Sequence, residues 1–316
     1  MNRRAEGIAR PLILMVGIVV SAACSAFAQE QEPAVISAIQ YLRTSYKNQP
    51  TGESAMTALA LLKAEVPAND PDLLACVARI HACLTTSTYE PVQKGGHDIY
   101  EAGVCAMVLA NQYAESNRPW IKLIADYLLQ KQKANGSWDY VYRTNGDASI
   151  SQYAILGLWE SENAGVDIPP STWDRAATWY MSVQSGAGSW CYHRDEGSPE
   201  TLSMTAAGVG SLLICQRQLD RYRGNRRGTS NLMKSLVADA GFGDYHPTTT
   251  NAQIDAAVRR GLGWISANFN PASLPAVGQT PYYMLYGIER IGALADRDKI
   301  GRVDWYERGR AYITST

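Results

Sequence analysis

The stretches Gln132-Lys-Ala-Asn-Gly136-Ser-Trp138 and Gln184-Ser-Gly-Ala-Gly188-Ser-Trp190 decide the fold of this chain. Both follow the pattern Q-x3-G-x-W, and corresponding residues lie 52 positions apart. A glutamine at a helix end, a glycine in a turn and a tryptophan that recur at this interval are typical of a stacked or closed array of repeats. The two stretches therefore predict the architecture more firmly than they predict the chemistry.

Helical periodicity extends this prediction over most of the chain, because apolar residues recur at intervals of three and four. Strand signals are scarce, and Gly, Pro and Asn mark turns between the periodic segments. The expected helices cover Ala34–Tyr46, Leu73–Leu84, Tyr100–Tyr113, Ile121–Gln132, Ile150–Trp159, Trp173–Val183, Leu202–Gln216, Ala256–Phe269 and Tyr282–Leu294.

Helices rich in small residues, around Ala58, Ala106, Ala154 and Ala206, alternate with bulkier helices. Small residues let helix backbones approach closely, as the inner helices of a ring must do. The sequence therefore predicts an all-α fold, an α/α toroid of about five and a half helix pairs in inner and outer rings. It would span residues 29–316, with a surface insertion at about 220–250.

The first 28 residues have the features of a signal peptide. Three arginines precede an apolar run over 11–20, and Ala26-Phe27-Ala28 is a small-x-small cleavage site. An alternative, lipidation at Cys24, is weakened by Ser21, which stands where a bulky residue is usual. We expect a secreted or periplasmic protein that is cleaved near Ala28 and keeps no transmembrane anchor in the mature chain.

Charge and cysteine content limit the classes of partner. The chain has 29 Lys and Arg, 30 Asp and Glu and a net charge of −1. This balance does not suggest a polyanion as partner, so we expect no nucleic-acid partner. We also expect a monomer. An odd number of cysteines remains after residue 28, which does not suggest a disulfide framework.

The two Q-x3-G-x-W phrases, each preceded by an aromatic or aliphatic pair, resemble the QW repeats of squalene and terpenoid cyclases. The resemblance covers roughly residues 33–313 and implies the α/α toroid that those cyclases share with protein prenyltransferase β-subunits. The chain is also similar to exported bacterial proteins described as prenyltransferase and squalene oxidase repeat proteins, a group defined by its repeats.

Each residue of the phrase has a structural interpretation. Gln132 and Gln184 can satisfy unpaired backbone groups at a helix end, and the two glycines supply the turn conformation. Trp138 and Trp190 would cover the joint between neighbouring repeats, with the ring N–H bound to a carbonyl. We interpret both phrases as structural rather than catalytic.

A squalene-cyclase-like enzyme begins its reaction with a D-x-D-D-T-A run, in which the second Asp protonates an alkene. Aligned by the helix that follows, Asp147 matches the first acid of that run. Ser149 stands where the proton donor would be, and Ile150 replaces the next carboxylate. The resemblance therefore implies the fold of a cyclase without its catalytic acid.

A protein prenyltransferase needs zinc to activate a thiolate. Weak candidates for its ligands are Cys191, His193 and Asp195, which alternate along one extended segment. They do not match the family's distribution of ligands over several repeats. We therefore expect no metal and no other cofactor.

Acids at the starts of the inner helices offer a different chemistry. Glu53, Glu101 and Ser149 lie 48 residues apart, and Glu200 is near the equivalent place in the next repeat. In a toroid these side chains would converge on one mouth, where paired carboxylates can act as acid and base on a glycan. The alternative is that first-turn acids only complement the helix dipole.

Tyrosines suggest a binding site, since the chain has 18 Tyr and 8 Trp but only 3 Phe. Five of the tyrosines lie on or near inner helices and could line a cavity for an isoprenoid, a sterol-like lipid or a glycan. The alternative is ordinary packing between rings. These residues are Tyr100, Tyr153, Tyr282, Tyr283 and Tyr286.

Three functions follow from these observations. The first is an exported cyclase-like repeat protein that binds an apolar or amphipathic ligand in a central cavity without cyclase chemistry. The second is a glycan-acting enzyme that uses Glu53, Glu101 and Glu200. The third is a protein-interaction scaffold.

Overall fold

A computed structural model of the chain describes residues 32–223, 244–269 and 281–315. The expected signal peptide, residues 1–28, and residues 224–243 of the expected insertion lie outside the described residues. The helices of the described part are α1 (Pro33–Ser45), α2 (Thr51–Lys63), α3 (Pro71–Ala82), α4 (His97–Lys131), α5 (Ala148–Asn163), α6 (Pro170–Ser182), α7 (Leu202–Asp220), α9 (Asn251–Asn268), α10 (Pro281–Leu294) and α11 (Trp305–Ser315).

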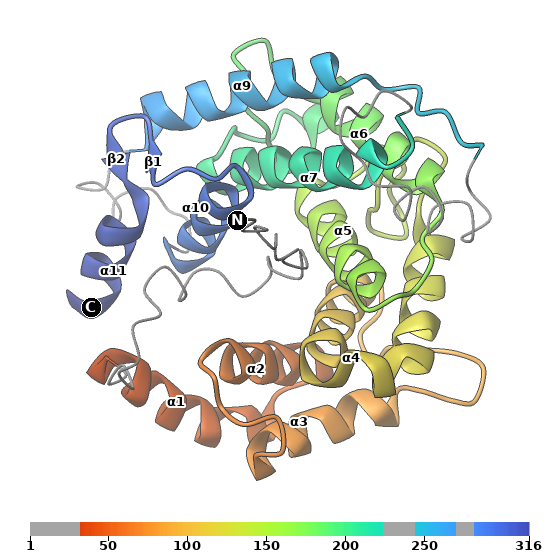
Figure 1. Ribbon diagram of the computed structural model, residues 1–316, viewed down its shortest axis with the longest axis vertical. Helices are drawn as coiled ribbons and strands as arrows, with labels where there is room; N and C mark the ends of the chain where they lie inside the picture. The colour runs from red at the N-terminus through yellow and green to blue at the C-terminus, as the bar shows by residue number, and fades with distance from the viewer. Residues whose placement is uncertain (1–31, 224–243, 270–280, 316) are drawn as a thin grey trace, which may run out of the picture. The chain divides into compact units, whose positions relative to one another are not determined.

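These helices form an inner and an outer layer, as Figure 1 shows. In the inner layer, α2 packs on the first half of α4, which packs on α5, then α7 and then α10. In the outer layer, α3 packs on α2, both α6 and α9 pack on α7, and α11 packs on α10. The prediction of an all-α fold with paired layers is confirmed, whereas the number of helix pairs in a toroid stays a prediction.

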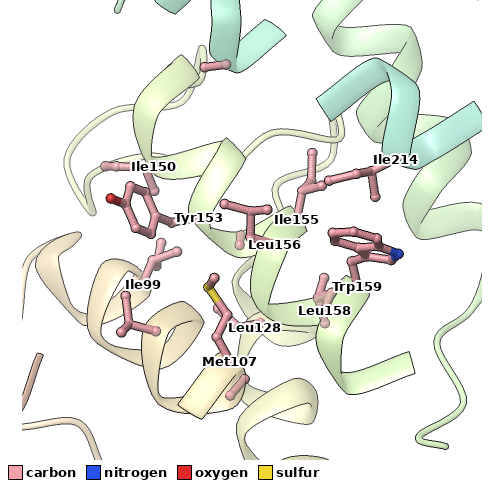
Figure 2. Close-up of a cluster of buried hydrophobic side chains, with 14 of the residues drawn as sticks. Ile99, Met107, Leu128, Ile150, Tyr153, Ile155, Leu156, Leu158, Trp159 and Ile214 are labelled. Atoms are coloured by element: carbon pink, nitrogen blue, oxygen red, sulfur yellow. The ribbon is translucent and has the colours of Figure 1, made fainter. Parts of the chain in front are cut away.

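The inner helices approach closely where they carry glycine. A Cβ atom added at Gly157 of α5 would lie 2.7 Å from the Cα atom of Gly103 of α4, and one added at Gly103 would overlap the carbonyl oxygen of Tyr153. Close-packed backbones leave large side chains to fill the space on either side of the contact. Figure 2 shows those contributed by α4, α5 and α7: Ile99, Met107, Leu128, Ile150, Ile155, Leu156, Leu158, Trp159 and Ile214.

Helix α4 supplies both layers because its backbone breaks at Tyr113, where φ is −148° and ψ is 76°. The break separates an inner half from an outer half, which the sequence predicted as two helices. The side-chain amide of Asn117 donates to the carbonyl oxygen of Leu109 at 3.0 Å across the break. This bond satisfies one of the carbonyls that a broken helix leaves unpaired.

Several helices begin with a side-chain cap. Asp147 accepts from the backbone N–H of Ile150 at 2.8 Å, and Thr201 accepts from Met204 at 3.0 Å. Thr250 and Gln253 form a reciprocal capping box at the start of α9. These caps fix the first turns of α5, α7 and α9.

The end of the described chain folds back as a short hairpin followed by α11. Strand β1 (Lys299–Ile300) pairs antiparallel with β2 (Val303–Asp304). Arg310 of α11 forms an ion pair of 2.7 Å with Glu32, the residue before α1, so the first and last described helices are joined. Over the described residues, none of the helices combines the length and the apolar character needed to cross a membrane.

Candidate functional site

The first Q-x3-G-x-W phrase is a joint between outer helices. The side-chain amide of Gln132 donates to the carbonyl oxygens of Gly136 and of Thr172, each at 3.0 Å. Trp138 is fully buried, and its ring N–H donates to the carbonyl oxygen of Leu128 at 2.8 Å. Because Thr172 belongs to α6, the glutamine ties the end of α4 to the next outer helix.

The second phrase repeats these contacts one helix pair later. Gln184 donates to the carbonyl oxygens of Gly188 and of Ala257, each at 2.9 Å. Trp190 is fully buried and donates to the carbonyl oxygen of Tyr180 at 2.8 Å. Ala257 belongs to α9, so this joint ties α6 to α9.

The glycine of each joint meets two requirements. Gly136 has φ of +95° and Gly188 has φ of +99°, a region that other L-residues rarely adopt. A Cβ atom at Gly136 would overlap the backbone of Arg175, and one at Gly188 would lie 2.6 Å from the carbonyl oxygen of Arg260. Backbone conformation and close approach both require glycine here.

Tyrosines and polar side chains of α4, α5 and α10 meet near the starts of these inner helices. The rings of Tyr100 and Tyr153 have centroids 5.1 Å apart in an edge-to-face contact. The hydroxyl oxygen of Tyr283 lies 2.8 Å from that of Ser149. Two helices of the contact are consecutive, and the third follows more than 100 residues later in the sequence.

An amide and a guanidinium continue this group along α5 and α10. The amide of Gln152, which is 3% exposed, donates to the Tyr283 hydroxyl. Nη1 of Arg290 donates to Oε1 of Gln152 at 2.9 Å, and the guanidinium lies 4.1 Å from the ring centroid of Tyr286. We call the following set the tyrosine cluster: Tyr100, Ser149, Gln152, Tyr153, Tyr283, Tyr286 and Arg290.

Burial raises the pKa of three hydroxyls of the tyrosine cluster. It raises the pKa of Tyr153 to about 12 and raises the pKa of Tyr100 and of Tyr283 above the ordinary value of a phenol. These groups can therefore donate or accept hydrogen bonds at neutral pH but do not carry charge. Tyr282 is 56% exposed, and its ring centroid lies 6.1 Å from that of Tyr312 in α11.

A buried imidazole and two carboxylates lie beside the tyrosine cluster. Nε2 of His193 is 3.3 Å from Oδ1 of Asp139 and 3.3 Å from Oδ2 of Asp147. Burial raises the pKa of Asp147, opposed by the N–H of Ile150 and by the charge of His193 when it is protonated. We call Asp139, Asp147 and His193 the Asp–His–Asp cluster.

Tyr140 links the two clusters. Its ring centroid is 6.4 Å from that of His193, and the charge of Asp147 adds to the burial that raises the pKa of Tyr100 and of Tyr140. The combined site therefore has aromatic faces, neutral hydroxyls, one guanidinium and a carboxyl–imidazole group that can hold a proton.

Among the expected rim acids, Glu101 is fully buried. Its Oε1 accepts from the hydroxyl of Tyr89 at 3.0 Å and from the N–H of Val92 at 2.9 Å, and its Oε2 accepts from the N–H of Gln93 at 3.1 Å. These bonds hold the loop that leads into α4 and occupy both oxygens of the carboxylate.

The other two rim acids are exposed. Glu53 accepts from the side chain of Gln93 at 3.2 and 3.3 Å, which places it beside Glu101. Glu200 lies 3.4 Å from Arg194, and hydrogen bonding with the hydroxyl of Ser189 lowers its pKa despite some burial. The structure thus joins Glu53 to Glu101 through Gln93, while the contacts of Glu200 are with other residues.

The three weak candidates for metal ligands lie in different environments. Cys191 is buried, which raises the pKa of its thiol, whereas Asp195 is exposed and accepts from Asn145. His193 turns toward the two aspartates instead. Within the described ranges, no group of three or more His, Cys, Asp and Glu side chains is placed to hold a metal ion.

Comparison with solved structures finds a similar fold in ent-copalyl diphosphate synthase from Streptomyces platensis. The TM-score is 0.53 at 16% sequence identity, over 85% of this chain and 46% of that chain. This chain therefore matches about half the length of that protein. At this identity the likeness shows the fold alone, which is a terpenoid-cyclase-like helical scaffold.

Comparison of the sequence with protein-family models and with curated proteins finds no match.

Sequence reasoning missed four residues of the site, and three of them carried a signal in the sequence. Asp139 follows Trp138 directly, where the other repeat has a cysteine, and Gln152 is a polar residue inside an apolar helix. Arg290 follows Tyr283 by seven residues, which places it on the same helix face. The fourth residue, Tyr140, carried no comparable signal.

Proposed function

We propose that this protein binds an apolar or amphipathic lipid-like ligand at the tyrosine cluster, on a terpenoid-cyclase-like scaffold. The ligand would lie against the aromatic faces and exchange hydrogen bonds with neutral hydroxyls. The same proposal includes export after cleavage near Ala28 and the absence of alkene-protonating chemistry.

The observation that carries the proposal is the convergence of the tyrosine cluster from α4, α5 and α10. Tyr100, Tyr153, Tyr283 and Tyr286 come from three inner helices, and their contacts are not part of the repeat. Aromatic side chains with a few well-placed polar groups are typical of small-molecule sites.

The position of the proton donor in cyclases supports binding without cyclisation. Ser149 stands at that position by alignment, and its hydroxyl contacts Tyr283 at 2.8 Å. A serine hydroxyl cannot protonate an alkene as a carboxylic acid does. The neighbouring Asp147 bonds to the first turn of α5 and contacts His193, which suits a positioning role.

The glycan-acting alternative receives less support. Both oxygens of Glu101 accept backbone or phenol hydrogen bonds, so this acid would have to break those contacts to act. The contacts of Glu200 are with residues other than Glu53 and Glu101. Tyrosine faces can also stack on sugars, so the test below includes an oligosaccharide.

The proposal is tested by equilibrium binding of radiolabelled oleyl alcohol and of a labelled oligosaccharide to the purified mature protein. We expect binding of the alcohol and at least a tenfold loss in the double variant Tyr100→Ala, Tyr283→Ala. Tyr282→Ala is the matched control, because this neighbouring ring contacts Tyr312 instead. Binding of the oligosaccharide alone, or equal binding by the double variant and the control, would contradict the proposal.

A further inference from the structure

The two terminal nitrogens of Arg290 differ in their hydrogen bonding. Nη1 is bound to Gln152, but Nη2 is buried and, among the described residues, has no hydrogen-bond partner. A buried donor left unpaired destabilises the folded state, more so when the group is charged. An acceptor that completes this donor would therefore stabilise the site.

No carboxylate of the described chain neutralises Arg290. Glu289, adjacent in sequence, forms no ion pair with Arg290 among the described residues; burial raises the pKa of Glu289, and the charge of Arg290 opposes that rise. Nη1 of the guanidinium binds the amide of Gln152, and the guanidinium packs over the ring of Tyr286; neither partner is a carboxylate.

The hydroxyl of Tyr153 is a second donor in the tyrosine cluster. The ring of Tyr153 is packed against Tyr100, but its hydroxyl forms no hydrogen bond with the described residues. Tyr153 directly follows Gln152, the partner of Nη1 of Arg290, in α5, and the charge of Arg290 opposes the rise in the pKa of Tyr153 that burial causes. A phenol O–H and a guanidinium N–H together match the acceptor pattern of an oxyanion.

The arrangement along α10 gives the ligand a direction. Tyr283, Tyr286 and Arg290 are separated by three and four residues, so they share one face of the helix. A chain-like ligand along this face would place its tail against the tyrosines and its head at Arg290.

From these contacts we infer that the ligand is an anionic amphipath, whose carboxylate or phosphate head binds Arg290 and Tyr153 while its apolar chain contacts the tyrosines. This inference rests on the proposed function and adds the charge of the ligand and the position of its head. Charge-assisted hydrogen bonds to a guanidinium are roughly twice as strong as neutral ones, so the anion should be clearly preferred.

The test compares oleate with oleyl alcohol, two probes that share one chain and differ in the head. We expect the mature protein to bind oleate at least about tenfold more tightly, as a charge-assisted bond of about 1.5–3 kcal/mol implies. Arg290→Gln should lower the affinity for oleate at least tenfold more than that for the alcohol. Arg290→Lys should restore part of the preference, and Arg259→Gln, an exposed arginine of α9, should leave it unchanged.

A second variant keeps the inference testable if the arginine variants fail to fold. Tyr153→Phe keeps the ring and removes the hydroxyl. It should lower the affinity for oleate several-fold more than the affinity for oleyl alcohol. Oleyl phosphate in place of oleate distinguishes a phosphate head from a carboxylate head. Equal binding of anion and alcohol by the unmodified protein would overturn the inference but leave the proposed function standing, whereas binding of neither would overturn the proposed function itself.

Discussion

The joint at residues 132–138 and the joint at residues 184–190 make the same contacts with different neighbours. In each, a glutamine bridges to the next outer helix, a glycine adopts positive φ, and a buried tryptophan donates to a carbonyl. Directly after the tryptophan the two regions differ. Asp139 and Val141 of the first correspond to Cys191 and His193 of the second.

This difference distinguishes the residues that hold the scaffold together from residues that belong to the candidate site. The residues that match between the two joints hold helices together, whereas two of the residues that differ, Asp139 and His193, form a polar contact. Asp139 from one loop and His193 from the other meet at 3.3 Å, and Asp147, which corresponds to Thr201 as the next helix cap, completes the group. The Asp–His–Asp cluster therefore forms where the two neighbouring repeats differ in sequence.

The largest expected effect comes from breaking a joint. Trp138→Ala and Trp190→Ala should each lower the free energy of unfolding by about 3–5 kcal/mol, because each removes a fully buried ring and its hydrogen bond. Chemical denaturation measures the change, with Tyr142→Ala, which is 76% exposed, as control. Unchanged stability in both tryptophan variants would show that the joints do not hold the scaffold.

A polar contact outside the joints should show a pH dependence that the joints lack. Burial raises the pKa of Glu162 from 4.5 to about 7, opposed by its 2.7 Å ion pair with Arg221. The folded state then holds the proton at a pH where the unfolded state has lost it. Stability should therefore fall as pH rises from about 4.5 to about 7, by at most roughly 3 kcal/mol.

The measurement for Glu162 is the unfolding free energy from pH 4 to pH 8 for the unmodified protein and for Glu162→Gln. The advantage of the unmodified protein over the variant should decline across that window and then level off. Glu115→Gln, an exposed residue of α4, should run parallel to the unmodified protein. A constant difference between Glu162→Gln and the unmodified protein would refute the assignment.

Gly186 and Gly188 lie in the same turn, but only Gly188 combines a positive φ with a close contact to a neighbouring backbone. Gly188→Ala should cost about 2 kcal/mol, because φ is +99° and the new Cβ would lie 2.6 Å from a backbone oxygen of Arg260. Gly186→Ala should change stability little, since a Cβ there meets no atom within 4 Å. Thermal unfolding of both variants makes the comparison, and equal losses would argue against the close approach.

The smallest expected effect compares two tyrosine hydroxyls. Tyr180→Phe should cost about 1 kcal/mol, because its hydroxyl donates to the carbonyl of Ala148 at 2.8 Å inside the scaffold. Tyr153→Phe should lie within about 0.5 kcal/mol of the unmodified protein, because its hydroxyl has no partner among the described residues. A larger loss for Tyr153→Phe would mean that the tyrosine cluster belongs to the scaffold.

Much of the fold could be predicted from the sequence, because repeated local signals specify it. Apolar periodicity and the Q-x3-G-x-W phrases indicated helix pairs, and the small residues of α4 and α5 indicated close inner packing. The break of α4 at Tyr113 was anticipated as a boundary between two helices. These features depend on neighbours within a few turns of the chain.

The site was predictable only in part, since its contacts join residues far apart in sequence. Four of the five expected tyrosines belong to the cluster, but the partners Gln152 and Arg290 lie 138 residues apart. The pairing of Asp139 with His193 spans 54 residues and two repeats. The spacing of residues in the sequence does not show which distant residues come into contact in the fold. It also gave no sign that Glu101 would hold the loop that leads into α4.

The most direct test of the central claim is native mass spectrometry, with lipid and glycan extraction, on the mature protein purified from its own host. The account predicts one bound anionic lipid per chain, largely lost in the double variant Tyr100→Ala, Tyr283→Ala. A bound oligosaccharide in its place, or a lipid that the double variant retains in full, would contradict it.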